Sequence, residues 1–137
     1  TDHAPHTIEE KSLPFELCPS GIASVEVAPL LLLDLAMKDF IPLSTVVKLL
    51  SRGPATLLNL RRWGCIGRGC IASFTFVDFH TETRLEDAVH ESKAKSIPYR
   101  GTVRGSICVT MVRGRVVYYQ GELYKPRAIP LTEVSKI

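Results

Sequence analysis

Hydrophobic residues dominate one stretch in the first third of the chain and follow a helical spacing in the next. Residues 25–38 are strongly apolar and predict a buried helix, with Ser24 as its N-cap and Glu26 in its first turn. Pro29 falls near the start of this helix, where proline is tolerated. An apolar stripe over residues 45–50 predicts a second helix.

Proline and glycine indicate where these elements should end. The sequence Ser-Arg-Gly-Pro at 51–54 is expected to end the second helix, and a third short helix should follow over residues 55–60. Two prolines and a glycine make residues 7–21 a predicted loop, and a loop of this length is often functional. Residues 121–137 are predicted to form a tail over the surface.

The second half of the chain changes to the spacing of strands. Residues 71–79 are rich in β-branched and aromatic side chains and predict a strand, and a short strand is expected near residues 84–87. Residues 107–112 and 115–119 alternate around Arg113-Gly114 and predict a β-hairpin. We therefore expect a helical first part and a β-rich second part.

Composition narrows the class of protein. The chain has 137 residues, 45% of them apolar, which is enough for one globular domain with its own core. The longest apolar run, residues 27–33, is too short for a membrane span and no secretory leader is visible, so we expect a cytoplasmic protein with no membrane contact. The net charge of +3 comes from scattered Lys and Arg, which argues against a nucleic-acid partner.

The four cysteines, Cys18, Cys65, Cys70 and Cys108, include no Cys-x-x-Cys pair. Cys65 and Cys70 are five residues apart in a Gly-rich turn, a spacing that fits zinc sites poorly. We therefore expect four reduced and mostly buried thiols that serve packing.

The first six residues, Thr-Asp-His-Ala-Pro-His, bring one carboxylate, two imidazoles and a proline together. Carboxylates and imidazoles transfer protons and bind metals, and Pro5 fixes the backbone angle φ between the two imidazoles. Taken alone, these residues allow a polar site, but also a simple cap or turn at Asp2 and an ordinary surface-loop residue at His6.

Three further motifs follow in order: Pro-Ser-Gly-Ile at 19–22, Gly-Cys-Ile-Gly-Arg-Gly-Cys-Ile-Ala at 64–72 and Ser-Lys-Ala-Lys-Ser-Ile-Pro-Tyr at 92–99. With the opening motif, they resemble the C-terminal part of a dihydroorotase, a cyclic-amide hydrolase of the amidohydrolase superfamily. Relatives usually carry Asp where this chain has Ser73. The His-x-His pair with which relatives hold their metals does not occur in this sequence.

The resemblance implies an α/β fold, namely a C-terminal fragment of a metal-dependent hydrolase (β/α)8 barrel, with its last strand and helices, plus part of a flanking β-sandwich. Residues 1–62 would form the end of the catalytic barrel with its active-site loop, and residues 63–137 the second half of the β-sandwich with the tail. A barrel needs about 250 residues, so its other strands are expected in an N-terminal part outside this chain.

By the same resemblance, Asp2 ligates a metal, expected to be zinc as one or two ions, and acts as the general base toward water. His6 binds the substrate's carboxylate, and the backbone at Ser20 and Gly21 meets the edge of the ring. His3 is left as a structural residue. These roles imply reversible hydrolysis of dihydroorotate to N-carbamoyl-L-aspartate in pyrimidine biosynthesis, with no activity for the isolated chain.

Two other functions stay open. A hydantoinase or allantoinase would open a related cyclic amide and would not need His6 to bind a carboxylate. A non-catalytic dihydroorotase-like scaffold would instead support a partner such as aspartate transcarbamoylase. The apolar helix at 25–38 lacks the barrel elements it would pack on, so we expect another chain, the N-terminal part or a homodimer partner, to cover it.

Overall fold

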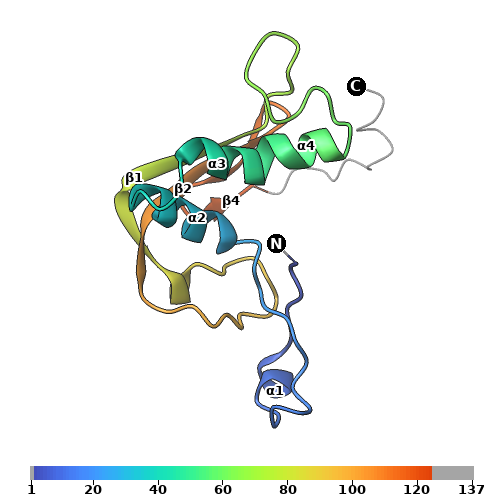
Figure 1. Ribbon diagram of the computed structural model, residues 1–137, viewed down its shortest axis with the longest axis vertical. Coiled ribbons are helices and arrows are strands. Elements are labelled where there is room, and N and C mark those ends of the chain that lie inside the picture. Colours follow the sequence, from blue (N-terminus) through green and yellow to red (C-terminus); the bar gives the residue numbers. More distant parts are fainter. Residues whose placement is uncertain (1, 125–137) are drawn as a thin grey trace. The chain divides into compact units, whose positions relative to one another are not determined.

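The computed structural model describes residues 2–124 (Figure 1). Most of the predicted tail over residues 121–137 lies outside these described residues. Within them, no helix is long and apolar enough to span a bilayer. The elements follow in the order α1 (Ile8–Lys11), α2 (Ala28–Met37), α3 (Leu43–Val47), π-helix η1 (Lys48–Arg52), α4 (Gly53–Leu57), β1 (Phe74–Arg84), 3-10 helix η2 (Leu85–Asp87), β2 (Thr102–Val112), β3 (Arg115–Tyr119) and β4 (Glu122–Leu123).

The chain divides into two compact units. The first unit contains the residues up to 43 together with 79–106, and the second contains 44–78 together with the residues from 107 onward. Strands β1 and β2 each contribute one part to either unit. The units interleave along the chain, and the assignment of residues 1–62 to a barrel and 63–137 to a sandwich stays a prediction.

The four strands form one sheet in the order β1-β2-β3-β4. Strands β2 and β3 pair antiparallel with Val112 opposite Arg115, and a bulge shifts their register midway. The turn between them is Arg113-Gly114, with φ of 52° and 80°. Positive φ at both central residues gives a tight hairpin the twist of its strands. The predicted hairpin is confirmed, and β2 begins earlier than expected.

The hairpin turn is fixed by the segment just before β1. The Arg113 backbone N–H donates to Ser73 Oγ (3.0 Å), and the Gly114 N–H donates to the Ala72 carbonyl oxygen (2.7 Å). Ser73 stands where the resemblance led us to expect Asp, and its hydroxyl still supplies an acceptor for the turn.

The first strand is longer than predicted, because β1 runs through Arg84 and not only to residue 79. The short strand expected near residues 84–87 is wrong, since η2 occupies this place. Leu85 and Ala88 are both buried. Residues three apart lie on one side of a 3-10 turn but on opposite faces of a strand, so burying both favours the turn.

Helix α2 begins later than predicted and without a side-chain cap. The N–H groups of Val27 and Ala28 donate to the Ser24 carbonyl oxygen (3.1 and 2.9 Å), whereas Ser24 Oγ is buried and has no hydrogen-bond partner among the described residues. The predicted N-cap at Ser24 is therefore wrong. Pro29 lies in the first turn, as predicted.

One buried carboxylate ties α2 to β2 within the first unit. Asp34 accepts hydrogen bonds from the Arg104 backbone N–H (3.0 Å) and from Lys38 Nζ (2.6 Å). Burial opposes the charge on Asp34, but these two donors outweigh it and hold the pKa of Asp34 below its usual value. The buried apolar side chains of the first unit include Leu30, Leu33, Leu85, Ile97 and Val103.

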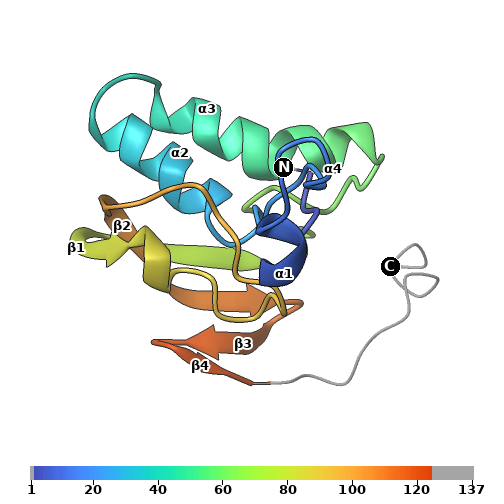
Figure 2. The ribbon, with the colours of Figure 1, turned by 90° about the horizontal axis from the view of Figure 1, so that it is seen from below.

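The helices α3, η1 and α4 follow one another without a break and form one rod (Figure 2). The helix end predicted at residues 51–54 is therefore wrong. The Gly53 N–H donates to the Lys48 carbonyl oxygen in the wider turn of a π-helix, and Pro54, which has no N–H, enters in the first turn of α4. A Cβ atom on Gly53 would lie 2.6 Å from that oxygen, so glycine is required here.

Cys65 and Cys70 form a disulfide, so the expectation of four reduced thiols is wrong for this pair. Their Cα atoms are 6.0 Å apart, a separation typical of disulfides. The glycine directly before each cysteine has a positive φ, Gly64 (66°) and Gly69 (85°), a conformation that helps the chain fold back on itself. Cys18 and Cys108 are free thiols and half-buried.

Candidate active-site loop

The opening motif lies beside the Pro-Ser-Gly-Ile motif. His3 pairs with Ile22 in an isolated parallel bridge, and the Ala4 N–H donates to the Ile22 carbonyl oxygen (3.1 Å). Because the pairing is parallel, Asp2 and Ser20 precede the bridge on the same side. The structure thus brings together two segments that are far apart in the sequence and that both carry predicted site residues.

Gly21 makes this close approach sterically possible. Its φ is 123°, a value that residues with a side chain rarely adopt. A Cβ atom at this position would also lie 2.8 Å from Ala4 Cβ. Both the backbone angle and the neighbouring segment therefore require glycine at position 21.

The loop predicted over residues 7–21 begins with a short helix, α1, which Figure 1 shows at the tip of the protruding segment. The Glu10 N–H donates to Thr7 Oγ1 (3.2 Å), and the Thr7 N–H donates to Glu10 Oε2 (3.0 Å). This reciprocal pair is a capping box, and the Thr-x-x-Glu spacing in the sequence could have revealed it. The expectation of an unstructured loop is wrong at this point.

Lys11 links the first part of the loop to its last residues. Its half-buried ammonium group donates to the carbonyl oxygens of Pro19 (2.8 Å) and Gly21 (3.1 Å). These two carbonyls flank Ser20, which is exposed. The backbone predicted to meet the substrate ring is thus held by a charged donor from α1.

Glu26 ties the residues after the Pro-Ser-Gly-Ile motif to a distant part of the chain. Its carboxylate accepts three backbone N–H groups, from His90 (2.8 Å), Glu91 (3.0 Å) and Ser92 (2.9 Å). Burial opposes the charge, but these donors outweigh it and lower the pKa of Glu26. This role of Glu26 was not predicted from the sequence, which indicated only a place in a helix turn, because its partners lie in a distant segment.

The two imidazoles of the opening motif have different partners. His3 Nδ1 accepts a hydrogen bond from the Val25 N–H (3.2 Å), which requires a lone pair on Nδ1 and fits the expected structural role. His6 Nδ1 lies 3.4 Å from Glu10 Oε2, and the His6 side chain is 28% exposed. His80 and His90 are exposed.

Asp2 is exposed and adopts a left-handed backbone conformation, with φ of 50°. Such a conformation is uncommon outside glycine, although Asp and Asn tolerate it better than most residues. Over residues 2–124, no three His, Cys, Asp or Glu side chains lie close enough to hold a metal ion. The described residues therefore do not form a metal site by themselves, and the role of Asp2 as a ligand stays a prediction.

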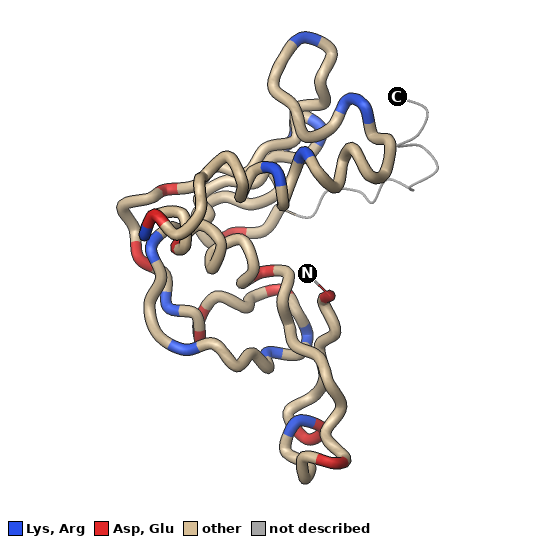
Figure 3. The backbone as a smooth tube through the Cα atoms, viewed as in Figure 1, with Lys and Arg blue, Asp and Glu red and all other residues tan. Residues whose placement is uncertain are grey.

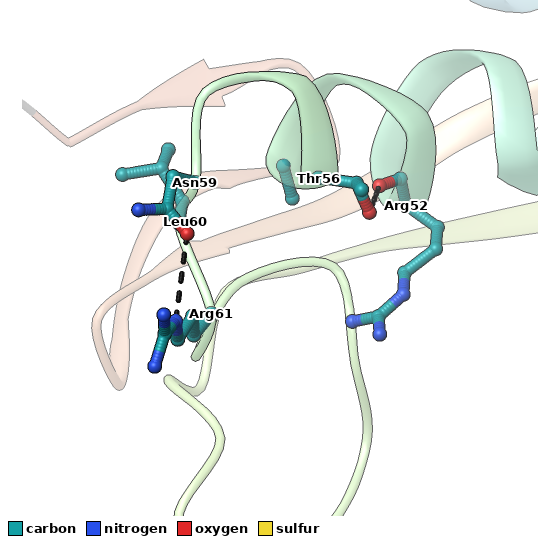
Figure 4. A pocket seen from close by; sticks show the side chains of 6 residues that line it. Arg52, Thr56, Asn59, Leu60 and Arg61 are labelled. Carbon is teal, nitrogen blue, oxygen red and sulfur yellow. Dashed lines mark hydrogen bonds between the residues drawn. The ribbon is translucent and has the colours of Figure 1, made fainter.

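A pocket of about 180 Å³ lies in the second unit and contains no predicted site residue (Figure 4). Its lining consists of Arg52, Ala55, Thr56, Asn59, Leu60 and Arg61. The stretch between Asp39 and Asp78 carries Lys and Arg but no acidic residue (Figure 3). The lining offers hydrogen-bond donors and no carboxylate or imidazole, so it lacks the acid–base groups that hydrolysis of an amide needs.

Curated relatives match most of the chain. It is 40% identical over 124 residues to a dihydroorotase of Methanothermobacter thermautotrophicus, 37% over 122 residues to one of Geobacter sp. and 34% over 130 residues to one of Saccharolobus solfataricus. These matches cover 90%, 88% and 94% of the chain but only 29%, 28% and 32% of the relatives. The chain therefore spans about three tenths of their length.

Solved structures show the same fold. The chain superposes on a D-hydantoinase (dihydropyrimidinase) from Thermus sp. with a TM-score of 0.81 and 24% identity, covering 92% of the chain and 29% of that structure. A second D-hydantoinase gives a TM-score of 0.75 and 22% identity, covering 85% and 26%. No protein-family model matches the chain. The α/β arrangement and the resemblance to dihydroorotases, predicted from the order of four motifs, are both confirmed.

Proposed function

We propose that this chain is the C-terminal part of a dihydroorotase, which reversibly hydrolyses the cyclic amide of dihydroorotate to N-carbamoyl-L-aspartate in pyrimidine biosynthesis. The observation that supports this most is the pairing of the Asp-His-Ala-Pro-His motif with the segment around Gly21. Similarity to dihydroorotases over nine tenths of the chain supports the same activity.

In this proposal, Asp2 is the general base. Its carboxylate takes a proton from the attacking water and returns it to the ring nitrogen as the carbon–nitrogen bond breaks. Asp2 also ligates zinc, as one or two ions whose other ligands lie outside this chain. A bound zinc ion activates water and polarises the carbonyl group.

The other predicted residues bind the substrate. His6 donates to the carboxylate of dihydroorotate, and the Ser20-Gly21 backbone meets the edge of the ring. The Lys11 contacts support this role, because they fix the carbonyls on both sides of Ser20 before substrate arrives. We further propose a cytoplasmic enzyme whose N-terminal part completes a (β/α)8 barrel and whose β-strands belong to a flanking β-sandwich.

The test is turnover of dihydroorotate by the complete protein. We expect Asp2→Asn to lower kcat by about a thousandfold, as expected for loss of a general base. Ser20→Ala, which keeps the backbone, should have little effect. The isolated 137-residue chain should be inactive with added zinc; turnover by it, or full activity of the Asp2 variant, would overturn the proposal.

A hydantoinase-type activity is the second candidate, because two solved structures with this fold are D-hydantoinases. Hydantoin carries no carboxylate for His6 to bind. Replacing His6 by Ala should therefore impair turnover of dihydroorotate far more than that of hydantoin. Equal losses on both substrates would favour the hydantoinase assignment.

A non-catalytic scaffold is the third candidate, and metal analysis of the complete protein separates it from the enzymes. A scaffold would bind a partner such as aspartate transcarbamoylase, or a second copy of itself, without zinc. Stoichiometric zinc in the purified complete protein would exclude this alternative.

A further inference from the structure

One carboxylate oxygen of Glu10 contacts two different groups. Glu10 Oε2 accepts the Thr7 N–H at 3.0 Å and lies 3.4 Å from His6 Nδ1. The His6 side chain is 28% exposed and that of Glu10 is 50% exposed. The capping box therefore fixes the carboxylate beside the imidazole before any ligand is present.

The charge of Glu10 is well defined. The Thr7 N–H, and to a lesser degree His6, hold the pKa of Glu10 below its usual value, so the group is a carboxylate at neutral pH. A carboxylate accepts hydrogen bonds and donates none. The nitrogen that faces it, Nδ1 of His6, must therefore carry the proton for a hydrogen bond to form.

The contrast with His3 shows that this arrangement is specific. His3 Nδ1 accepts the Val25 N–H, so the His3 proton lies on Nε2. His6 has the opposite arrangement at Nδ1, which leaves its Nε2 for another partner. For Nε2 to donate as well, the ring must carry both protons, and Nε2–H is then a charged donor.

We propose that Glu10 is a positioning residue for His6: it holds the Nδ1–H so that Nε2–H is presented as a donor to the carboxylate of the substrate. This inference rests on the proposed function, since it deepens the role given to His6. Its consequence is selective binding of ring substrates that carry a carboxylate.

Glu10→Gln in the complete protein separates this role from capping. Gln supports a capping box as Glu does, but it has no charge to pair with the imidazole. We expect a rise in KM for dihydroorotate of about fivefold with kcat within about twofold, the size of a largely exposed ion pair. Dihydrouracil, the same ring without the carboxylate, should be turned over as by the wild type.

Two control variants complete the experiment. Glu9→Gln removes an adjacent charge and should leave both substrates unaffected. Thr7→Ala removes one hydrogen bond of the capping box but keeps the carboxylate, so it should lower the unfolding temperature with a smaller change in KM.

Three outcomes would overturn the inference while the wild type still hydrolyses dihydroorotate. They are an unchanged KM in Glu10→Gln, an equal effect on dihydrouracil, and a KM effect no larger than that of Thr7→Ala. A wild type that does not hydrolyse dihydroorotate would instead count against the proposed function. The two failures are therefore distinguishable.

Discussion

The N-terminal segment (residues 2–27) and the helical stretch (residues 43–57) are stabilised in different ways. In the N-terminal segment, charged side chains bind backbone groups of loops: Lys11 binds two carbonyl oxygens within the segment, and Glu26 binds the N–H groups of residues 90–92. In the helical stretch, the backbone bonds to itself, and Gly53 is a sterically restricted position. The first depends on specific side chains, whereas the second depends on local helical geometry.

The two units also differ in the number of apolar side chains that they bury. The first unit buries apolar side chains from many segments, among them Ala23, Val27, Leu30, Leu33, Leu85, Ala88, Val89, Ile97 and Val103. The described part of the second unit buries Val46 and Ala55, while Leu57 is 86% exposed. Apolar side chains of the helical stretch are thus largely exposed in the described part of the chain, whereas the first unit encloses most of its own.

The largest effect on stability is expected from Gly21→Ala. Both the φ of 123° and the contact with Ala4 oppose a side chain, so the free energy of unfolding should fall by about 3 kcal/mol in urea titration. Gly101→Ala is the control, because Gly101 has φ of 93° but open space around it. Equal losses in the two variants would show that the approach to Ala4 contributes nothing.

Glu26→Ala should cost about 2 kcal/mol at neutral pH, because three backbone donors lose a charged acceptor but remain within reach of water. The pKa of Glu26 is lowered by folding, so its contribution is present above the ordinary pKa of a glutamate and is lost as pH falls through the lower folded value. Wild type and variant should therefore converge in acid.

The control for Glu26 is Glu86→Ala. Glu86 is exposed and accepts the backbone N–H of Gly101 (3.1 Å), so its replacement should show a smaller loss in the same urea titrations. A difference between wild type and the Glu26 variant that did not change with pH would contradict an electrostatic anchor.

Gly53→Ala tests the helical stretch. A methyl group would meet the Lys48 carbonyl oxygen, so the π turn must shift and the free energy of unfolding should fall by about 1.5 kcal/mol. Gly67→Ala is the control, since its nearest contact would be an ordinary 3.9 Å to Cys70 Sγ. Stabilisation by Gly53→Ala, as in a regular helix, would show that the π turn is absent in solution.

The smallest effect is expected from Leu57→Ser in the 137-residue chain. The side chain is 86% exposed, so the change should be below about 0.5 kcal/mol. Val46→Ala is the buried counterpart and should cost about 2 kcal/mol, since Val46 is 2% exposed. A cost for Leu57 equal to that for Val46 would indicate that another chain already covers this face in solution.

Local signals predicted several elements correctly. Alternation around Arg113-Gly114 predicted the hairpin, because a two-residue turn with positive φ depends on adjacent residues only. Other local signals misled. The prediction of a helix end at residues 51–54 was wrong, because a π turn accommodates Gly53-Pro54 within a continuous helix. The prediction of reduced thiols at Cys65 and Cys70 was wrong, because the positive φ of the glycine before each cysteine lets the chain fold back over this short separation.

The sequence by itself determined which chemical groups are available: the carboxylate and imidazoles of the opening motif, the glycine at position 21 and the order of motifs that resembles dihydroorotases. Only the tertiary structure decided what holds them, since Glu26 meets donors 64 to 66 residues away and Lys11 caps carbonyls 8 and 10 residues away. The physical reason is that periodicity reports local backbone geometry, whereas contacts between a side chain and a remote backbone group depend on how the loops close.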